Sequence, residues 1–413
     1  MTTEPNLNSI LFATYAVKRE GKRLRTSGPV QPFIDYFVPR FPEVYVLEQP
    51  LPESEDLLPT LEIYRGGALA ETRRLPRWLR PWWHVSARRK ARSGTILRLK
   101  LRDAISLAWA AFGVARRPFD LVIGMESVNA AGAVFLRRLG KAQRAIYYLF
   151  DFTPTRYAGA LMNRAYLALD RFCCRRCDLV WNISEAYARA REEELGYPPE
   201  KLAPQVTVNY GVNLDAIEFP PEESIDRRRL VFAGTVNREN GIDILMEAFP
   251  LVLREEPETT LLILGGGRML EEVRGWAEKT ELGGAVNVAG MVAEQRELTR
   301  KLAAAGIALA PYPDYPQSTK KYGDVMKIRD YLACRLPVVT TDVPPISARI
   351  AELPAGAVSS PNPGDFARAI LSLLRDSELY RTCRRHAREL AEENIWEKNF
   401  SRGLDGLRAL RKR

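Results

Sequence analysis

Histidine and long apolar runs are scarce in this chain of 413 residues. The two histidines, His84 and His386, exclude a multi-histidine metal centre. A Ser-His-Asp hydrolase is also disfavoured, because neither histidine follows an expected strand. No stretch approaches the roughly 20 apolar residues of a membrane-spanning helix, and the polar N-terminus is unlike a signal peptide. We therefore expect a cytoplasmic protein whose contact with a membrane is peripheral.

Cysteine is also sparse, with five residues: Cys173, Cys174, Cys177, Cys334 and Cys383. The pair Cys174 and Cys177 has the spacing of half a zinc or redox site, but no second pair completes it. Because these residues fall in an expected helix, we interpret them as core thiols in a reducing compartment.

Acidic residues are absent from the segment 72–102, which holds eleven basic ones. The segment carries +11, whereas the rest of the chain sums to −1. The basic character is therefore one patch, which argues against a protein that coats nucleic acid over its whole surface. With 46% apolar residues the chain can build packed cores, and its length predicts two domains.

Three tryptophans accompany the basic residues of this patch. Aromatic rings beside arginine suit the headgroup region of an anionic membrane. We expect that contact from Arg77, Trp78, Arg80, Trp82, Trp83, Arg88 and Arg89. A solvated insertion is the alternative, and an RNA-binding patch is disfavoured because no RNA-binding module accompanies it.

Short β-branched runs alternate with amphipathic segments along the chain, which is typical of parallel sheets with crossover helices. The expected strands of the first half are 9–14, 44–47, 120–123, 145–150, 179–183 and 206–209. Those of the second half are 230–233, 260–264, 286–289, 307–310, 338–341 and 356–359. The pattern predicts an α/β protein with two doubly wound, Rossmann-like domains, 1–218 and 219–393. A last helix, 394–413, is expected to pack back on the first domain.

Ligands of such sheets bind beyond the carboxyl ends of the strands, so the residues at these ends are the candidates for a binding site. In the second half, glycines follow three expected strands and allow close approach of a ligand to the backbone. The candidates for binding a diphosphate-containing donor here are Gly234, Arg238, Gly265, Arg268 and Met291. The alternative is a set of solvated turns.

The stretch 322–342 resembles a motif of the retaining GT-B glycosyltransferases of the large family-four group, which reads K-x-x-E-Y-L-A-x-G-x-P-V-V-x-T-D. The matching positions are Lys327, Asp330, Tyr331, Leu332, Ala333, Pro337, Val338, Val339, Thr341 and Asp342. Three further motifs of that family occur in order before it, at 232–243, 265–268 and 286–290. The chain departs from the family at Tyr322, Thr235 and Asn240, where Glu, Arg and Lys are usual.

The resemblance implies a GT-B fold, in which two Rossmann-like domains face a central cleft. It implies transfer of a sugar from a UDP- or GDP-linked donor to an acceptor hydroxyl of a glycan or lipid-linked acceptor. It further implies retention of configuration, no metal or other cofactor, and a role in cell-surface polysaccharide or glycolipid biosynthesis. Within this resemblance Lys327 would bind the diphosphate and Asp330 the nucleotide ribose.

In the first half, the expected strands 120–123 and 145–150 end beside polar residues. Asp151 and Glu126 are the catalytic candidates, and Arg156 and Asn129 are the candidates for acceptor binding. For Asp151 the alternative is a cap of the next helix. For the whole chain the alternatives are an inactive GT-B-like binding or scaffold subunit, suggested by the three departures, and a sugar-nucleotide epimerase.

Overall fold

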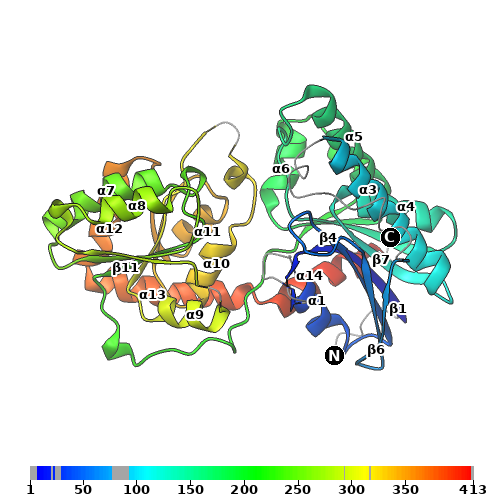
Figure 1. The fold of residues 1–413 in the computed structure, drawn as a ribbon, viewed down its shortest axis with the longest axis horizontal. Helices are drawn as coiled ribbons and strands as arrows, with labels where there is room; N and C mark the ends of the chain where they lie inside the picture. Colours follow the sequence, from blue (N-terminus) through cyan, green and yellow to red (C-terminus); the bar gives the residue numbers. More distant parts are fainter. Residues whose placement is uncertain are drawn as a thin grey trace. The chain divides into compact units, whose positions relative to one another are not determined.

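The computed structural model describes residues 7–19, 22–23, 29–76, 93–292, 294–315 and 318–410, which form two compact units (Figure 1). Unit 1 comprises Met1–Val208 and Phe400–Arg413, and unit 2 comprises Asn209–Asn399. The first boundary lies ten residues before the predicted one. The predicted last segment, 394–413, is divided between the two units instead of forming a separate part.

Unit 1 contains an eight-stranded sheet in the order β10-β9-β8-β7-β1-β4-β5-β6. Its strands are β1 (Ser9–Ala16), β4 (Glu43–Pro50), β5 (Thr60–Arg65), β6 (Ala68–Arg74), β7 (Phe119–Met125), β8 (Ala142–Leu149), β9 (Leu179–Asn182) and β10 (Gln205–Thr207). A separate pair, β2 (Lys18–Arg19) and β3 (Lys22–Arg23), is antiparallel. The neighbours β8, β7 and β1 are parallel, so their carboxyl ends share one edge of the sheet.

Helices cover both faces of this sheet. They are α1 (Val30–Phe37), α3 (Ser93–Ala108), α4 (Glu126–Arg138), α5 (Ala160–Arg176), α6 (Glu185–Glu193) and α14 (Trp396–Ala409). A π-helical turn, Trp109–Val114, continues α3. On β1, Phe12 stacks on Phe33 of α1, whereas Tyr15 bonds to Asp103 of α3. Alternate residues of one strand thus hold helices on opposite faces.

The predicted return of the C-terminal helix to the first domain is confirmed. On α14, Phe400 meets the rings of Phe33 and Phe37 edge-on. The indole N–H of Trp181 donates to the carbonyl of Gly403 at 3.2 Å. A Cβ at Gly403 would lie 2.7 Å from the Trp181 ring, so glycine is required for this close packing.

At one edge of the sheet, β5 and β6 form an antiparallel hairpin that the strand predictions did not include. Its second strand contains the start of the basic segment, where Arg73 pairs with Glu71 just outside the segment. Arg102 is the last residue of the basic segment and is 1% exposed. It pairs with Asp103 at 2.7 Å and donates to the carbonyls of Pro50 and Leu57. Arg102 therefore anchors α3 and is not part of a surface patch, which corrects the prediction of eleven surface charges.

Unit 2 contains a six-stranded parallel sheet in the order β13-β12-β11-β14-β15-β16. Its strands are β11 (Arg229–Ala233), β12 (Thr260–Leu264), β13 (Val286–Gly290), β14 (Ile307–Ala310), β15 (Val338–Thr341) and β16 (Gly356–Ser359). Its helices are α7 (Ile242–Glu255), α8 (Leu270–Ala277), α9 (Gln295–Ala303), α10 (Met326–Ala333), α11 (Ile346–Glu352), α12 (Pro363–Arg375) and α13 (Ser377–Glu393).

Two cores lie on opposite faces of this sheet. On β11, Leu230 and Phe232 belong to the core under α7, α8 and α12, while Val231 and Ala233 belong to the core under α9, α10 and α11. Both faces are apolar because parallel sheets with crossover helices are covered on both sides. The predicted α/β class with two doubly wound sheets is confirmed. Among the described residues, no helix has the length and apolar character needed to cross a bilayer.

Candidate functional site

In unit 2, α10 is fastened to the end of β11. The hydroxyl of Tyr331 accepts from the N–H of Ala233 at 2.7 Å and donates to the carbonyl of the same residue at 3.1 Å. One helical turn earlier, Lys327 lies beside Gly234, the residue that follows β11. A Cβ at Gly234 would be 3.5 Å from the Cδ atom of Lys327. The structure thus brings together two predicted donor-site residues, Gly234 and Lys327.

The ammonium group of Lys327 is buried and has no hydrogen-bond partner among the described residues. It lies 4.3 Å from the ring centroid of Phe232 and 4.5 Å from that of Tyr312. Burial, with a smaller contribution from Lys320, holds the pKa of the Lys327 amine well below its usual range. A buried cation without a partner is costly, so this position is suited to an anion that enters from outside the chain.

The other predicted cations of unit 2 are paired within the chain. Arg238 pairs with Asp243 at 3.2 Å, and Arg268 pairs with Glu239. Lys321, a further basic residue near the motif, pairs with Asp314 at 2.5 Å. Arg238 and Arg268 are both largely exposed. Their charges are therefore partly neutralised, which leaves Lys327 as the better placed of these cations.

The starts of α7 and α10 also differ in how far their charge is neutralised by side chains of the protein. In the loop before α7, the side chain of Asn237 accepts from the N–H of Asn240, and Asp243 adds a carboxylate to the first turn. At α10 no side chain caps the helix, and its first turn contains Lys327 and no acidic residue. An anion is favoured at a helix N-terminus, so α10 is the better anion site of the two.

The remaining predicted donor residues surround the same strand ends. Gly265 has a φ of +153°, and a Cβ there would lie 1.8 Å from the carbonyl oxygen of Gly234, so these two loops touch. Met291, after β13, is 80% exposed. Asp330 is half-buried on α10, three residues after Lys327.

The carboxylate that the family has at position 322 is not supplied by the nearby Asp324. That carboxylate is paired with Arg329 at 3.0 Å and accepts from the N–H of Tyr210 at 2.9 Å. Burial raises the pKa of the Asp324 carboxyl. Asp324 therefore holds the start of α10 in place, and Tyr322 remains a departure from the motif.

In unit 1, Glu126 has an unusual backbone conformation at the end of β7. Its φ is +63°, a left-handed value that is strained for a residue with a side chain. Its Oε1 accepts from the N–H groups of Phe150 at 3.1 Å and Asp151 at 3.2 Å, just beyond β8. Burial raises the pKa of the Glu126 carboxyl, and Arg156 acts in the opposite direction. Such strain at a strand end is typical of functional sites.

Asp151 and Arg156 lie next to Glu126. Arg156 pairs with the Asp151 carboxylate at 2.9 Å and also donates to its carbonyl oxygen. Asp151 is 57% exposed. It does not cap the next helix, because α5 begins only at Ala160 and its N-cap, Gly159, makes no side-chain bond. The pair is thus an exposed, charged feature beside Glu126.

The prediction that Asn129 contacts an acceptor is corrected. Asn129 is fully buried on α4, and its amide exchanges two hydrogen bonds of 2.8 Å with Gln49 of β4. A side chain whose polar atoms are already paired in the core serves packing. Its position near the strand end made it a candidate, but its side chain faces the interior.

Three residues around Glu126 were not among the candidates predicted from the sequence. Lys100 of α3 donates to the hydroxyl of Tyr15 at 2.9 Å, and that hydroxyl donates to Asp103 at 3.1 Å. Burial lowers the pKa of Lys100. The charge of Glu126 acts to raise this pKa, and the charge of Arg156 acts to lower it. Burial raises the pKa of Tyr166 of α5, and the charge of Glu126 raises it further. Tyr15 directly follows the predicted strand 9–14, so reading the end of that strand could have found it.

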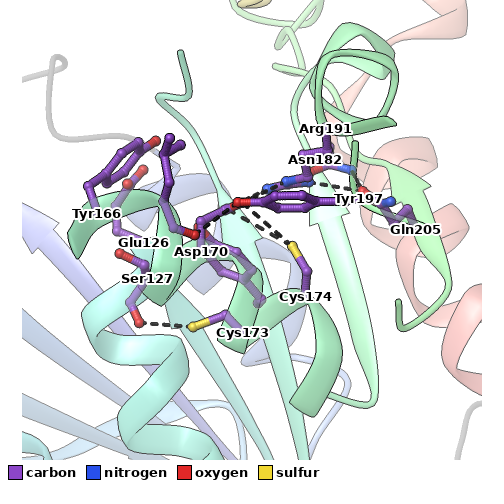
Figure 2. A network of polar contacts seen from close by, with 12 residues as sticks. Glu126, Ser127, Tyr166, Asp170, Cys173, Cys174, Asn182, Arg191, Tyr197 and Gln205 are labelled. Atoms are coloured by element: carbon purple, nitrogen blue, oxygen red, sulfur yellow. Dashed lines mark hydrogen bonds and ion pairs between the residues drawn. The ribbon is translucent and has the colours of Figure 1, made fainter. Parts of the chain in front are cut away.

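A buried network supports α5 (Figure 2). Arg191 of α6 donates to both oxygens of Asp170, at 2.8 and 3.0 Å, and neither side chain is exposed. Arg191 also donates to Asn182 and Gln205, both at 2.9 Å. Asp170 follows Tyr166 by one turn of α5. The network therefore fixes the helix that carries Tyr166 toward Glu126.

The cysteines fit the prediction of core thiols, since all five are free and buried. The Cys173 thiol bonds to the carbonyl of Ser127 at 3.2 Å, which joins α5 to α4. Burial raises the pKa values of Cys173, Cys174 and Cys177. Within the ranges given above, no group of three or more His, Cys, Asp or Glu side chains could hold a metal ion.

The predicted membrane residues Arg77, Trp78, Arg80, Trp82, Trp83, Arg88 and Arg89 lie outside the described residues.

Residues 227–376, from the residues before β11 to the end of α12, match the family model "Glycosyl transferases group 1". Residues 227–376 are therefore similar to a group 1 glycosyltransferase domain. A relative in Jonesia denitrificans, named D-inositol 3-phosphate glycosyltransferase, is 28% identical over 190 residues. That match spans 44% of this chain and 42% of the relative, which is less than half of either protein.

Solved structures resemble the chain along its length. Sucrose-phosphate synthase from Thermosynechococcus elongatus has a TM-score of 0.69 at 14% identity, covering 98% of this chain and 99% of that one. HepE of Anabaena in complex with UDP has a TM-score of 0.65 at 14% identity, covering 98% and 100%. At these identities the likeness concerns the fold, which is GT-B. The prediction of a GT-B fold is thereby confirmed.

Proposed function

We propose that this protein transfers a sugar from a nucleoside diphosphate sugar, UDP- or GDP-linked, to a hydroxyl of a glycan or lipid-linked acceptor. In this reaction a bond forms between the acceptor oxygen and the anomeric carbon, and the bond from that carbon to the diphosphate breaks. The acceptor proton passes to a base or to the departing diphosphate. The relative in Jonesia denitrificans and the Anabaena structure with UDP support this class of reaction.

The observation that carries the proposal is the buried, unpartnered ammonium of Lys327 beside Gly234. Negative charge grows on the diphosphate as its bond to the sugar breaks. A fixed cation at the first turn of an uncapped helix stabilises that charge without reorganisation. The paired states of Arg238 and Arg268 favour Lys327 for this role. Asp330, on the same helix, is proposed to bind the ribose.

Unit 1 is proposed to bind the acceptor. Glu126 is a strained carboxylate with a raised pKa, and Asp151 and Arg156 form a charged pair beside it. These groups suit orientation of a hydroxyl and of the transferred sugar. The proposal includes retention of configuration and catalysis without a metal, as the resemblance to the retaining family implies. It also includes a role in cell-surface polysaccharide or glycolipid synthesis at the inner face of the membrane.

A thermal-shift panel with UDP, GDP and their common sugar derivatives tests the donor assignment. Stabilisation by one nucleotide, lost in Lys327→Ala, is expected. An unchanged nucleotide affinity in Lys327→Ala would overturn the assignment of Lys327.

Donor hydrolysis separates an enzyme from a scaffold subunit. Wild type is expected to release free sugar from the donor that stabilises it, and Glu126→Gln and Lys327→Ala are expected to release less. Nucleotide binding without hydrolysis or transfer to any offered acceptor would favour the scaffold, for which the Tyr322 departure is the motivation.

A further inference from the structure

An apolar stripe runs along the exposed side of α3. The exposed positions Leu97, Leu101, Ala104, Ala108 and Phe112 follow one another at intervals of three or four residues, which places them on one side of the helix. Leu97 is 73% exposed, and Leu101 and Phe112 are each more than half exposed. A surface helix of a protein surrounded only by water would carry polar residues here.

The neighbouring helix α4 extends this apolar surface. A Cβ at Gly132 of α4 would lie 2.4 Å from Leu107 of α3, so the two helices pack closely side by side (Figure 1). On α4 and just after it, Phe135 and Leu139 are 53% and 64% exposed. The α3–α4 face is defined here by Leu97, Leu101, Phe112, Phe135 and Leu139.

Cations accompany the α3–α4 face, and exposed acids do not. The guanidinium of Arg138 lies 5.9 Å from the ring centroid of Phe135, and the ammonium of Lys141 lies 5.1 Å from that of Phe112. Arg98 is exposed next to Leu97. The acidic residues of α3 and α4 are Asp103, which is 1% exposed and paired, and Glu126, which faces the strand ends. The face is therefore apolar and positively charged only.

We propose that the α3–α4 face docks on an anionic lipid bilayer, with its leucine and phenylalanine side chains in the headgroup boundary and its cations against lipid phosphates. Apolar side chains flanked by Arg and Lys are the composition that binds such surfaces. The residues of this face are not the ones in the tryptophan-containing stretch 77–89 that the sequence predicts to meet the membrane. The inference deepens the proposed role at the inner face of the membrane and rests on that part of the proposed function, but it does not depend on the donor site.

A second copy of the chain is a poorer occupant of the same face. In a twofold contact the face would meet itself, so Arg98, Arg138 and Lys141 would approach their own copies. The α3–α4 face offers no exposed carboxylate to pair with them, and like charges at an interface oppose association. An anionic bilayer supplies the missing negative charge and an apolar layer together.

Flotation of the full-length protein with vesicles tests the proposal. We expect wild type to float with vesicles of phosphatidylcholine and phosphatidylglycerol, and far less with phosphatidylcholine alone. Leu97→Ser/Leu101→Ser and Arg98→Ser/Arg138→Ser are each expected to lose about tenfold or more of that binding. The controls are Leu69→Ser, an exposed leucine of β6, and Arg254→Ser/Arg381→Ser on exposed helical positions of unit 2. Both controls should bind as wild type does.

Two results would overturn the inference. One is a wild type that does not float, or a Leu97→Ser/Leu101→Ser variant that floats as well as Leu69→Ser. The other is a wild type that is dimeric by light scattering, becomes monomeric in Leu97→Ser/Leu101→Ser and binds no vesicles. Stabilisation by nucleotide, measured on the same samples, should be equal in all variants. Vesicle binding without nucleotide binding would instead contradict the donor assignment alone.

Discussion

The hydroxyl of Tyr331 is hydrogen-bonded to both the N–H and the carbonyl of Ala233. This double contact joins the middle of α10 to the last residue of β11. Lys327 is one turn away on the same helix, so its position beside Gly234 depends on Tyr331. The tyrosine of the sequence motif therefore acts as a positioning residue for the lysine, without contact with a ligand being required.

Tyr331→Phe is expected to destabilise the protein by about 1–3 kcal/mol, because the buried N–H of Ala233 loses its partner. Nucleotide affinity should fall several-fold as Lys327 gains freedom. Urea unfolding and nucleotide titration measure the two effects. Tyr380→Phe is the matched control, since its hydroxyl makes longer bonds: it donates to Gly306 at 3.3 Å and accepts from Arg384 at 3.5 Å. Equal nucleotide affinity in the two variants would contradict a positioning role.

Lys327→Met is expected to stabilise the free protein and to weaken nucleotide binding. Removal of a buried ammonium that has no partner should raise the free energy of unfolding by about 1–3 kcal/mol. Loss of a charged contact to the diphosphate should weaken affinity about 10- to 100-fold. Lys301→Met, at a surface lysine paired with Glu297, is the control and should change neither quantity appreciably. A destabilised Lys327→Met protein would show that the ammonium has a partner within the fold.

Nucleotide affinity is expected to decline as pH rises through the lowered pKa of Lys327. Below that pKa the lysine is charged before binding, whereas above it each pH unit costs up to about tenfold in affinity. Titrations from about pH 7 upward avoid protonation of a terminal phosphate. Proton uptake on binding, measured by calorimetry in buffers of different ionisation enthalpy, should appear in the same interval. A pH profile identical in wild type and Lys327→Met would exclude this titration.

The carboxyl of Glu126 has a raised pKa, so it should make stability fall with rising pH. Below the pKa of the unfolded state, which is about 4.5, Glu126 is protonated in both the folded and the unfolded protein and no stability is lost. Above that pKa the folded protein must release a proton that it binds more tightly than the unfolded protein does, so its stability falls. Glu126→Gln keeps an oxygen that accepts from Phe150 and Asp151 but does not titrate. Its melting temperature relative to wild type should therefore rise across this interval. A constant difference at all pH values would contradict the raised pKa.

The sequence predicted unit 2 more closely than unit 1. Four strands of unit 2, such as Thr260–Leu264 and Val338–Thr341, have the predicted bounds, because buried parallel strands are short β-branched runs between turn residues. The hairpin β5–β6 was missed although Leu61 and Ile63 alternate with polar residues and Gly66-Gly67 forms its turn. Edge strands carry a weaker apolar signal because one of their sides is solvated.

Site residues were predictable where the backbone alone decides their place. Gly234 and Lys327 follow from strand ends and the motif, whereas pairing between distant side chains does not. The partners of Arg268 and Asn129 come from another loop and another strand, so their availability could not be inferred from local sequence. Likewise Glu126 bonds to residues 24 and 25 positions later, just beyond β8, which local sequence does not reveal.

Asp170→Asn tests whether the buried network of unit 1 positions the acceptor side. Removal of one partner leaves Arg191 charged and buried, which should cost about 3–5 kcal/mol of unfolding free energy. Asp170→Asn/Arg191→Met should recover part of this loss, because no uncompensated charge then remains. Because α5 also carries Tyr166, donor hydrolysis should fall in the single variant even at temperatures where it is folded. Stabilisation of unit 2 by nucleotide should persist in both variants, which separates a local effect in unit 1 from general unfolding. Wild-type hydrolysis by a folded Asp170→Asn protein would show that the network supports the fold alone.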